Sequence, residues 1–396
     1  MMKKNIVFML INMNVGGTEK ALLNMISEIP KSEYDITILM LEKYGGFLNS
    51  IPSEVNVEYV KEYCELKEVL NRPPKEVALN LLKRGKICGT IGLLFTQLLS
   101  KFLKNRSIFF KYVLKNVPGL KSEYDIAVAY AGPMDFISYF VIHKIKAKKK
   151  VQWIHFDVSK IGFNINFAVK IYKYFDRIYV VSDEARKKLI KLAPSTKEKS
   201  EVFLNVVSSN IIKKQSLEGE GFRDNYEGHR ILTVGRLANE KGQDIAIRVL
   251  ARLVKEGYKV KWYCLGEGSS RTEYERLIKE YNVQDKFILL GSNPNPYPYM
   301  DQCDIYVQPS RYEGYCITLA EARALQKPII TTNFTGAKEQ IKNEITGIIV
   351  DIQEEQIYFA IKKLLNNPRQ STVFYFNLSK EIFKDINQME KIYHLV

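Results

Sequence analysis

Residues 304–322 read DIYVQPSRYEGYCITLAEA, and this stretch shows the unit from which the rest of the chain is built. Its first five residues predict a short buried β-strand, the following polar residues with a glycine predict a loop, and the remainder predicts a helix. Glu313 lies in the loop and Glu321 eight residues later in the helix, which places both acids on nearly the same face. The stretch therefore predicts paired carboxylates at the carboxyl end of a strand.

Similar strand, loop and helix units occur on both sides of this stretch. We expect strands at residues 5–11, 34–40, 55–60, 124–130, 151–155 and 177–181, and again at 230–234, 259–265, 286–290, 304–308, 328–331 and 347–350. Strands that alternate with helices are typical of parallel sheets covered by helices on both faces. The sequence therefore predicts an α/β fold with two doubly wound, Rossmann-like domains.

The domain limits follow from a change in composition. Residues 207–229 are polar, lack sustained periodicity and separate the two series of strands, as expected for a linker. A length of 396 residues fits two domains at roughly 100 to 200 residues each. We expect a first domain at 1–207, a second at 208–372 and a last helix at 373–396 that packs back on the first. Residues 67–120 interrupt the first domain and predict two or three basic amphipathic helices.

The composition is that of a globular protein. It is 46% hydrophobic and 26% charged, which excludes disordered and low-complexity scaffolds. Five cysteines without a C-x-x-C pair indicate neither a disulfide framework nor a zinc cluster, so a reducing, cytoplasmic location is expected. The apolar runs 87–99 and 108–114 are shorter than the roughly 20 residues of a membrane-spanning helix, and we expect neither a span nor a signal peptide.

The net charge of +15 indicates an anionic partner. Residues 77–122 contain no acid but nine basic residues, namely Lys83, Arg84, Lys86, Lys101, Lys104, Arg106, Lys111, Lys115 and Lys121, and a second basic run spans 144–150. Basic amphipathic helices can lie on an anionic membrane surface. A solvated charged face with an apolar core side is the alternative, and both interpretations stay open here.

Two loops that follow strands have features of anion-binding sites. Gly16 and Gly17 stand at a strand-to-helix turn, where glycine permits close approach of a ligand to the helix N-terminus. The pattern G-x-G-x-x-G is absent, which disfavours a nicotinamide cofactor. Arg236 and Lys241, with Gly235 beside them, follow another strand and can converge on a diphosphate. A solvated basic loop is the alternative for this second loop.

The ordered set of motifs resembles the retaining glycosyltransferases of family 4, a part of glycosyltransferase group 1 with the GT-B architecture. The resemblance rests on G-G-T-E after the first strand, the run around Arg236 and Lys241, the G-E-G turn at 266–268, the acids Glu313 and Glu321, and T-G-I-I-V at 346–350. It covers the second half of the chain well and the first half more loosely. It implies two domains that face each other across a cleft.

The resemblance also implies roles for individual residues. Arg236 and Lys241 would bind the donor diphosphate, Glu321 the ribose hydroxyls, Glu313 the sugar hydroxyls, and His155 would reach the donor sugar near the reacting carbon. The expected catalytic set is His155, Arg236, Lys241 and Glu313. The expected donor site comprises Gly16, Gly17, Gly235, Arg236, Lys241, Gly266, Gly291, Glu313, Gly314, Tyr315, Cys316, Ile317, Thr318 and Glu321. The helix start at Gly336 is a further expected anion site.

Two positions differ from the family pattern. Gln326 stands in A-L-Q-K-P where the family usually has glycine, and Tyr315-Cys316 replace a more usual Phe-Gly after the first acid. These positions lie on the donor side and leave the sugar preference open. None of the charged groups that the chemistry requires is missing.

The expected function is retaining transfer of a hexose-type sugar from a nucleoside-diphosphate sugar, a UDP-sugar in preference to a GDP-sugar, to a hydroxyl of a lipid-linked or other glycan acceptor in bacterial surface polysaccharide synthesis. No cofactor or metal is expected, because no Asp-x-Asp motif occurs and cationic side chains can replace a divalent ion. The expected location is cytoplasmic, with peripheral contact to an anionic membrane. A catalytically silent GT-B partner subunit and a basic nucleic-acid-binding protein are the alternatives, although no nucleic-acid-binding module is recognised.

Overall fold

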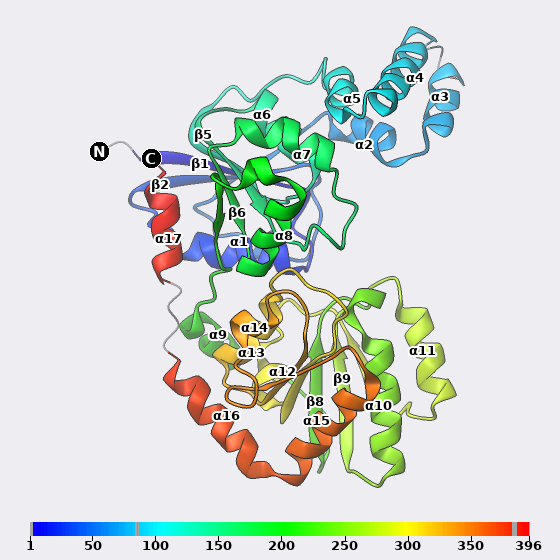
Figure 1. The fold of residues 1–396 in the computed structure, drawn as a ribbon, viewed down its shortest axis with the longest axis vertical. Helices are drawn as coiled ribbons and strands as arrows, with labels where there is room; N and C mark the ends of the chain where they lie inside the picture. Colours follow the sequence, from blue (N-terminus) through cyan, green and yellow to red (C-terminus); the bar gives the residue numbers. More distant parts are fainter. Residues whose placement is uncertain (1–2, 84, 86, 382–385, 396) are drawn as a thin grey trace.

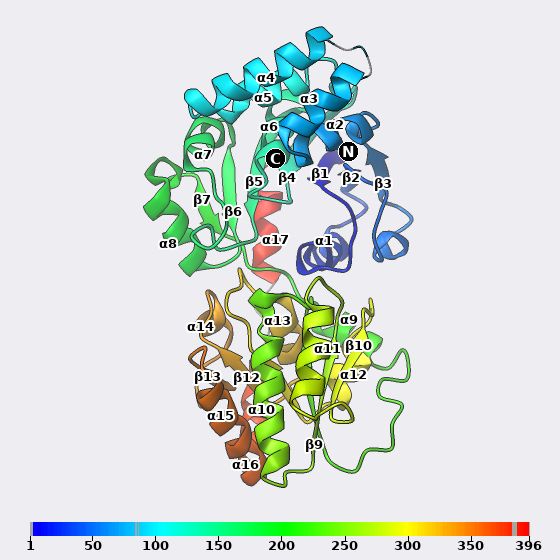
Figure 2. The ribbon, with the colours of Figure 1, turned by 90° about the vertical axis from the view of Figure 1, so that its right-hand side faces the viewer.

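The computed structural model describes residues 3–83, 85, 87–381 and 386–395 and shows two α/β lobes, one above the other (Figures 1 and 2). Within the described residues the first lobe contains a seven-stranded sheet in the order β3-β2-β1-β4-β5-β6-β7, and the second a six-stranded sheet in the order β10-β9-β8-β11-β12-β13. Neighbouring strands are parallel in both sheets. This confirms the expected pair of doubly wound domains.

The strands of the first lobe are β1 (Lys4–Leu10), β2 (Tyr34–Met40), β3 (Asn56–Tyr59), β4 (Glu123–Ala129), β5 (Lys146–Ile154), β6 (Arg177–Val180) and β7 (Ser200–Val202). Its helices are α1 (Gly17–Glu28), α2 (Tyr63–Asn71), α3 (Pro74–Lys83), α4 (Ile87–Phe102), α5 (Arg106–Val113), α6 (Asp135–Lys144), α7 (Ile165–Ile171) and α8 (Asp183–Leu192). The short edge strand β7 was not expected, because three residues are too few for a periodicity signal.

The strands of the second lobe are β8 (His229–Val234), β9 (Val260–Leu265), β10 (Phe287–Gly291), β11 (Ile305–Gln308), β12 (Ile329–Thr332) and β13 (Ile348–Val350). Its helices are α9 (Ser209–Ser216), α10 (Gln243–Lys255), α11 (Arg271–Glu280), α12 (Tyr297–Gln302), α13 (Ile317–Ala324), α14 (Ala337–Gln340), α15 (Glu354–Asn366) and α16 (Pro368–Lys380). Each strand expected from the sequence is present, with small shifts at the ends of most.

The central strands are buried on both faces. In β1, Phe8 and Leu10 join one apolar cluster, whereas Val7 and Met9 join the cluster on the other side of the sheet. Such strands appear in the sequence as continuous apolar runs, which explains why their positions could be predicted. The first of these clusters also contains residues of α12 and α13, so a single apolar core continues from one lobe into the other.

Three expectations about the connections need correction. The segment 207–229 is not a simple linker, because it contains α9, which packs on α12 and α13. The basic run 144–150 is largely the start of β5, where Lys148 pairs with Asp125 at 2.7 Å and Lys149 with Asp176 at 3.6 Å. The region beyond 373 is not one helix: α16 continues to Lys380, and a separate helix α17 (Ile386–Tyr393) follows.

Helix α17 returns to the first lobe (Figures 1 and 2). Its Lys391 donates to the backbone oxygen of Val202 and accepts a hydrogen bond of 2.7 Å from Tyr179 at its own backbone oxygen. The ring of Tyr393 stacks on Tyr34, with centroids 5.6 Å apart. These contacts confirm the expected return of the C-terminal helix.

Within its described residues, the segment 67–120 contains three complete helices, α3 to α5, as expected, and the end of α2, which begins earlier at Tyr63. They project beyond the sheet of the first lobe (Figure 1). Arg84 and Lys86, two of the nine basic residues counted in this region, lie outside the described residues. No helix in the described part of the chain is both long and apolar enough to span a bilayer.

Candidate active site

The candidate site lies where the strand order of each sheet reverses. The first strands β1 and β8 are flanked by β2 and β4, and by β9 and β11, respectively. In open α/β sheets, ligands bind outside the carboxyl ends of the strands at such switch points. The loops that follow β8 and β11 carry Lys241 and Glu313, and the loop that follows β1 carries Gly16 and Gly17. The topology therefore brings the predicted motifs of both lobes to facing edges.

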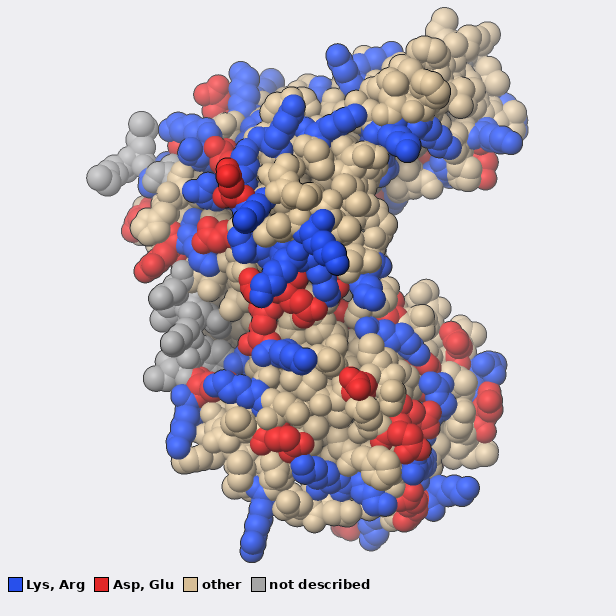
Figure 3. Space-filling view, viewed as in Figure 1, with Lys and Arg blue, Asp and Glu red and all other residues tan. Residues whose placement is uncertain are grey.

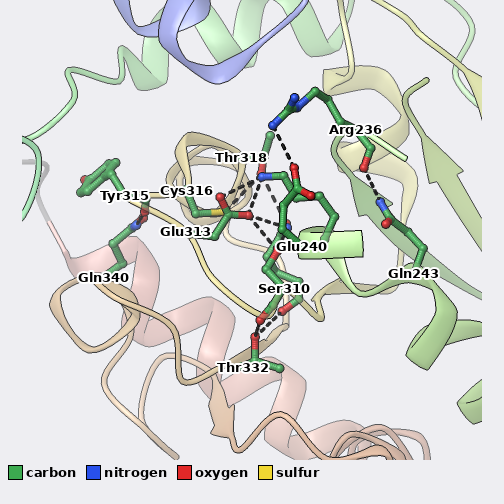
Figure 4. A network of polar contacts seen from close by, with 12 residues as sticks. Arg236, Glu240, Gln243, Ser310, Glu313, Tyr315, Cys316, Thr318, Thr332 and Gln340 are labelled. Carbon is green, nitrogen blue, oxygen red and sulfur yellow. Dashed lines mark hydrogen bonds and ion pairs between the residues drawn. The ribbon is translucent and has the colours of Figure 1, made fainter. Parts of the chain in front are cut away.

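Lys241 and Glu313 form a close, mostly buried ion pair. Lys241 Nζ lies 2.6 Å from Oε1 and 2.8 Å from Oε2 of Glu313. The side chains are 17% and 9% exposed, respectively. Burial acts to lower the pKa of Lys241, but the charge of Glu313, its hydrogen bond and the nearby Cys316 together outweigh burial, so the pKa is raised. The ammonium group therefore stays charged and is held by both carboxylate oxygens (Figure 4).

A chain of polar side chains fixes the carboxylate of Glu313 from the opposite side. Ser310 Oγ donates to Glu313 Oε1 at 2.7 Å, and Gln308 Nε2 donates to Ser310 Oγ at 2.8 Å. Gln308 Oε1 accepts a bond of 2.7 Å from the buried Tyr306 hydroxyl. Sequence reasoning did not identify this support, although Gln308 and Ser310 stand in the quoted stretch. A buried glutamine at the end of an apolar strand was the signal that could have indicated it.

Arg236 pairs with a different carboxylate. Its Nη2 lies 3.0 Å from Glu240 Oε1, and its side chain is 60% exposed. The Arg236 backbone oxygen accepts a bond of 2.8 Å from Gln243, which fixes the loop but not the guanidinium group. Figure 4 shows the contact between Arg236 and Glu240 beside Glu313. The two predicted cations are thus neighbours, and they have different carboxylate partners.

Glu321 lies in a buried position on α13. Its Oε1 accepts a hydrogen bond of 2.8 Å from the Tyr297 hydroxyl. Burial raises the pKa of Glu321 to about 7, while Lys20 and Tyr297 act in the opposite direction. The Lys20 ammonium lies 4.8 Å from the centroid of the Tyr297 ring, so α1 of the first lobe reaches the surroundings of Glu321. Neither Lys20 nor Tyr297 was expected in the site, because their proximity depends on the packing of the two lobes.

His155 follows β5 and is buried. Its ring packs against Tyr130, with centroids 4.5 Å apart, and its Nε2 has no hydrogen-bond partner among the residues that the structure describes. Burial lowers the pKa of His155 to about 3, although a backbone hydrogen bond with Tyr130 acts to raise it. The imidazole is therefore neutral at physiological pH, with one ring nitrogen unpaired.

The loop from Gly314 to Thr318 contacts the first lobe. A Cβ atom at Gly314 would lie 1.8 Å from the backbone oxygen of His155, so only glycine permits this close approach. Ile317 lies against Gly17, because a Cβ atom there would be 3.3 Å from Ile317 Cγ2. Tyr315 O accepts a bond from Gln340, which fixes the start of α13. These contacts bring Gly17, His155, Gly314 and Ile317 together across the lobe interface.

The two departures from the family pattern share one backbone feature. Cys316 has φ 61° and Gln326 has φ 55°, both in the left-handed region that glycine occupies readily. The Cys316 thiol is buried, which raises its pKa, and it lies 3.4 Å from Thr318 Oγ1. These positions therefore keep the glycine-like conformation although each carries a side chain.

Glu19, in the first turn of α1, is the acid of the G-G-T-E motif. Burial raises the pKa of Glu19 to about 7, and the charge of Arg236 on the other lobe acts to lower it. The Gly16 backbone oxygen accepts the first helical bond, from Lys20 N at 3.0 Å. The motif thus presents an acid and a helix start to the facing loop of Arg236.

Other predicted groups lie at adjacent strand ends. Gly266 N donates to Gly291 O at 2.8 Å. A Cβ atom at Gly266 would lie 2.0 Å from Gly235 O, so the backbones of these three glycines lie in close contact at neighbouring strand ends. The backbone N–H of Gly336, expected to face an anion, points to Glu184 of the first lobe at 3.4 Å. Among the residues that the structure describes, no group of three or more His, Cys, Asp or Glu side chains is arranged to hold a metal ion.

Comparison with known proteins finds a family match for the second lobe. Residues 221–380 match the family model described as glycosyl transferases group 1. An N-acetylgalactosaminyltransferase of Campylobacter jejuni that acts on a diphospho-undecaprenol-linked sugar is 32% identical over 174 residues, which cover 43% of this chain and 46% of that protein. The capsular polysaccharide biosynthesis glycosyltransferase CapM of Staphylococcus aureus is 29% identical over 207 residues, or 48% of this chain and 52% of that protein.

These alignments span about half the length of the curated relatives. The solved structure of HepE from Anabaena, in complex with UDP and glucose, covers 99% of this chain and 98% of that protein, with a TM-score of 0.72 at 16% identity. At this identity the likeness shows the fold alone. The second lobe therefore matches glycosyl transferases group 1, and the two-lobed architecture is the GT-B fold.

Proposed function

We propose that the protein transfers a sugar from a nucleoside-diphosphate sugar to a hydroxyl group of an acceptor. The observation that carries this proposal is the buried contact between Lys241 and Glu313 at the switch point of the second sheet. Arg236 lies on the same loop, and Glu321 on the helix that follows Glu313. This arrangement offers two cations for a diphosphate and two acids for the hydroxyls of the ribose and the sugar.

The cations suit the leaving group. As the bond between the sugar and the diphosphate breaks, negative charge grows on the leaving oxygen, and Lys241 and Arg236 can stabilise it. The Arg236 side chain is 60% exposed and its partner Glu240 21%, and ion pairs at the surface contribute only about 0–1 kcal/mol. Arg236 can therefore exchange Glu240 for a diphosphate at small cost.

The neutral imidazole of His155 suits a position near the reacting carbon. A neutral ring with an unpaired nitrogen can accept a hydrogen bond from a sugar hydroxyl or donate one to it. It does so without placing a positive charge beside the cationic character that develops on the sugar ring. We further propose retention at the anomeric carbon, with the departing phosphate accepting the acceptor proton. Metal independence is part of the same proposal, since the sequence lacks an Asp-x-Asp motif and the two cations can replace a divalent ion.

The relatives support a class of donor and acceptor. HepE was solved with UDP and glucose, and the Campylobacter jejuni relative is named for a diphospho-undecaprenol acceptor. We therefore propose a UDP-linked hexose-type donor and a polyprenyl-linked glycan acceptor, in surface polysaccharide synthesis. The proposed location is cytoplasmic, with peripheral contact to the anionic membrane.

The central test replaces Lys241 by Met and, separately, Glu313 by Gln. Loss of one oriented stabilising group typically reduces the rate about 100- to 1000-fold. Sugar transfer and hydrolysis of UDP-glucose and UDP-N-acetylglucosamine would be measured for each variant. Glu280→Gln is the matched control, because it makes the same chemical change in an exposed ion pair of 2.7 Å with Arg276. Unchanged turnover in Lys241→Met would remove the assignment.

Binding measurements separate the alternatives. A nucleoside diphosphate at about 100 times its dissociation constant adds about 2.7 kcal/mol to the free energy of unfolding, which a thermal shift detects. A silent partner subunit would show no turnover with any donor, and Lys241→Met would then change no rate. A nucleic-acid-binding protein would retain RNA or DNA on a filter at physiological salt and would show no shift with UDP.

A further inference from the structure

Helix α4 carries an apolar face that no other part of the described protein covers. Five side chains on this face are 58–85% exposed, and they recur every three or four residues, namely Ile87, Ile91, Phe95, Leu98 and Phe102. This spacing places them along one side of the helix. Large exposed apolar patches on folded proteins mark interaction sites.

The opposite face of α4 is fixed to the first lobe. Leu93 is buried in the apolar core, and Tyr112 of α5 donates a hydrogen bond of 3.0 Å to the backbone oxygen of Gly89. A Cβ atom at Gly92 would lie 2.5 Å from the Tyr112 hydroxyl, so the two helices approach closely. The outward direction of the apolar face is therefore set by packing on α5.

Leu79 and Leu82 of α3, together with Leu103 beyond α4, extend this exposed apolar surface. We call the eight side chains Leu79, Leu82, Ile87, Ile91, Phe95, Leu98, Phe102 and Leu103 the apolar platform. Figure 3 shows the outer part of the helical projection almost free of charged side chains, with Lys and Arg side chains around its base.

The charges next to α4 are positive, and the exposed acid Glu76 lies in the first turn of α3. No charged residue occurs between Ile87 and Ser100, and Lys101 and Lys104 follow directly, while Lys83 precedes the helix. Lys83, Lys101 and Lys104 are exposed, and the sequence from 77 to 122 contains no acid. An apolar stripe with lysines at its ends is the pattern of a helix that lies in the interface of an anionic bilayer.

The length of α4 agrees with this arrangement. At 16 residues and about 1.5 Å per residue it is roughly 24 Å long, and α4 is not a membrane-spanning helix. A helix lying in the membrane plane needs only one apolar face.

The helical projection and the space between the lobes can be compared in one view. Figure 3 shows a hollow between the two lobes on the side toward which the helical projection extends.

We propose that the apolar platform docks the protein on an anionic bilayer, with Phe95 and Leu98 inserted among the lipid chains and the flanking lysines at the phosphate groups. This proposal rests on the membrane contact of the proposed function and assigns that contact to the apolar platform; the role in acceptor delivery rests on the proposed sugar transfer. The basic charges attract the protein to the surface, and the apolar face holds it there.

The experiment is flotation of the full chain with vesicles of phosphatidylcholine, with and without phosphatidylglycerol. We expect binding to the vesicles that contain phosphatidylglycerol, and an at least tenfold loss of binding in Phe95→Asp/Leu98→Asp. Phe359→Asp is the matched control, because Phe359 is similarly exposed on the other lobe and should leave binding unchanged. Hydrolysis of the UDP-sugar should be equal in all three proteins, which separates this result from failure of the proposed function.

Other outcomes would overturn the proposal. Equal binding of the wild type and Phe95→Asp/Leu98→Asp, together with a loss in Lys101→Glu/Lys104→Glu, would show that charge alone binds the membrane. A wild-type dimer that Phe95→Asp/Leu98→Asp converts to a monomer, without vesicle binding, would show that the platform is an interface between two copies. Circular dichroism and thermal melting of each variant would confirm that it is folded.

Discussion

Lys188 of α8 donates a hydrogen bond of 2.7 Å to Thr335 Oγ1, and this bond joins the two lobes. Both side chains also bind Asp157: Lys188 Nζ lies 2.8 Å and Thr335 Oγ1 2.7 Å from its Oδ2. Next to them, Glu339 of the second lobe accepts bonds of 3.1 Å from the first two backbone N–H groups of α8. The lobes are thus connected by charged groups at the edge of the candidate site.

Replacement of Thr335 by Val should weaken this connection. Val has a similar shape but cannot donate to Asp157 or accept from Lys188, and loss of such bonds to charged groups costs about 1.5–3 kcal/mol. Urea unfolding would measure the change in the free energy of unfolding. Thr372→Val is the control, because the Thr372 hydroxyl is exposed and makes only a 3.4 Å bond within α16, so it should change stability little. Equal stability of both variants would contradict this account.

Asp157 should make the protein sensitive to acid. Burial acts to raise the pKa of Asp157, but bonds from Lys188, Ser159 and Thr335 lower it to about 2, from 3.8. Because the folded-state pKa is lower than the unfolded-state pKa, the contribution of Asp157 is present above pH 4 and is lost as the pH falls toward 2. We expect Asp157→Asn to be less stable than wild type at pH 6, with a smaller difference at pH 2.5. A difference that does not vary with pH would be evidence against the assigned charge.

Glu321 should have the opposite pH dependence. Its pKa is raised to about 7, from 4.5, so the stability it contributes is present below pH 4.5 and is lost as the pH rises through 7. Glu321→Gln should therefore gain stability relative to wild type between pH 4.5 and 8, by on the order of 3 kcal/mol. Lys20→Met removes the nearby positive charge and should move the titration of Glu321 to higher pH. Thermal unfolding across this pH range would measure both effects.

The sequence was sufficient for every strand except the short β7, and for the residues that follow the central strands. The strand Ile305–Gln308 is buried on both faces. Such a strand appears in the sequence as a short, largely apolar run, so its position can be predicted. Because carboxyl ends of parallel strands share an edge, Lys241 and Glu313 could be expected to meet although 72 positions separate them.

The missing parts depend on contacts that no local pattern encodes. Lys20 reaches Tyr297 only because α1 packs on α13 across the lobe interface. The N–H of Gly336 was expected to face an anionic ligand. In the structure it points to the carboxylate of Glu184, a residue of the facing lobe. The apolar run of α4 could have been a core helix, and its exposure follows from the projection of α2 to α5 beyond the sheet.

Replacement of Gln326 by glycine should stabilise the fold. The Gln326 φ of 55° is left-handed, a conformation that costs a residue with a side chain about 1–2 kcal/mol. Gln326→Gly should stabilise the fold by about 0.5–1 kcal/mol after the greater backbone entropy of glycine in the unfolded chain is included. Gln326→Ala is the control, because alanine keeps the strained conformation and should bring no gain. Chemical denaturation would compare the three proteins, and a larger gain in the alanine variant would refute this explanation.

Arg236 and Glu240 allow a double-mutant test of the proposed diphosphate site. Glu240→Gln frees the guanidinium group from its 3.0 Å partner, so the affinity for UDP should rise by up to about fivefold, the equivalent of a surface ion pair of 0–1 kcal/mol. Arg236→Ala should lower the affinity about 10- to 100-fold, as expected for lost hydrogen bonds between charged groups. In the double variant, Glu240→Gln should no longer raise the affinity, because the group that it frees is absent. Isothermal titration with UDP would measure all four proteins, and an equal gain from Glu240→Gln with and without Arg236 would show that Arg236 does not bind the diphosphate.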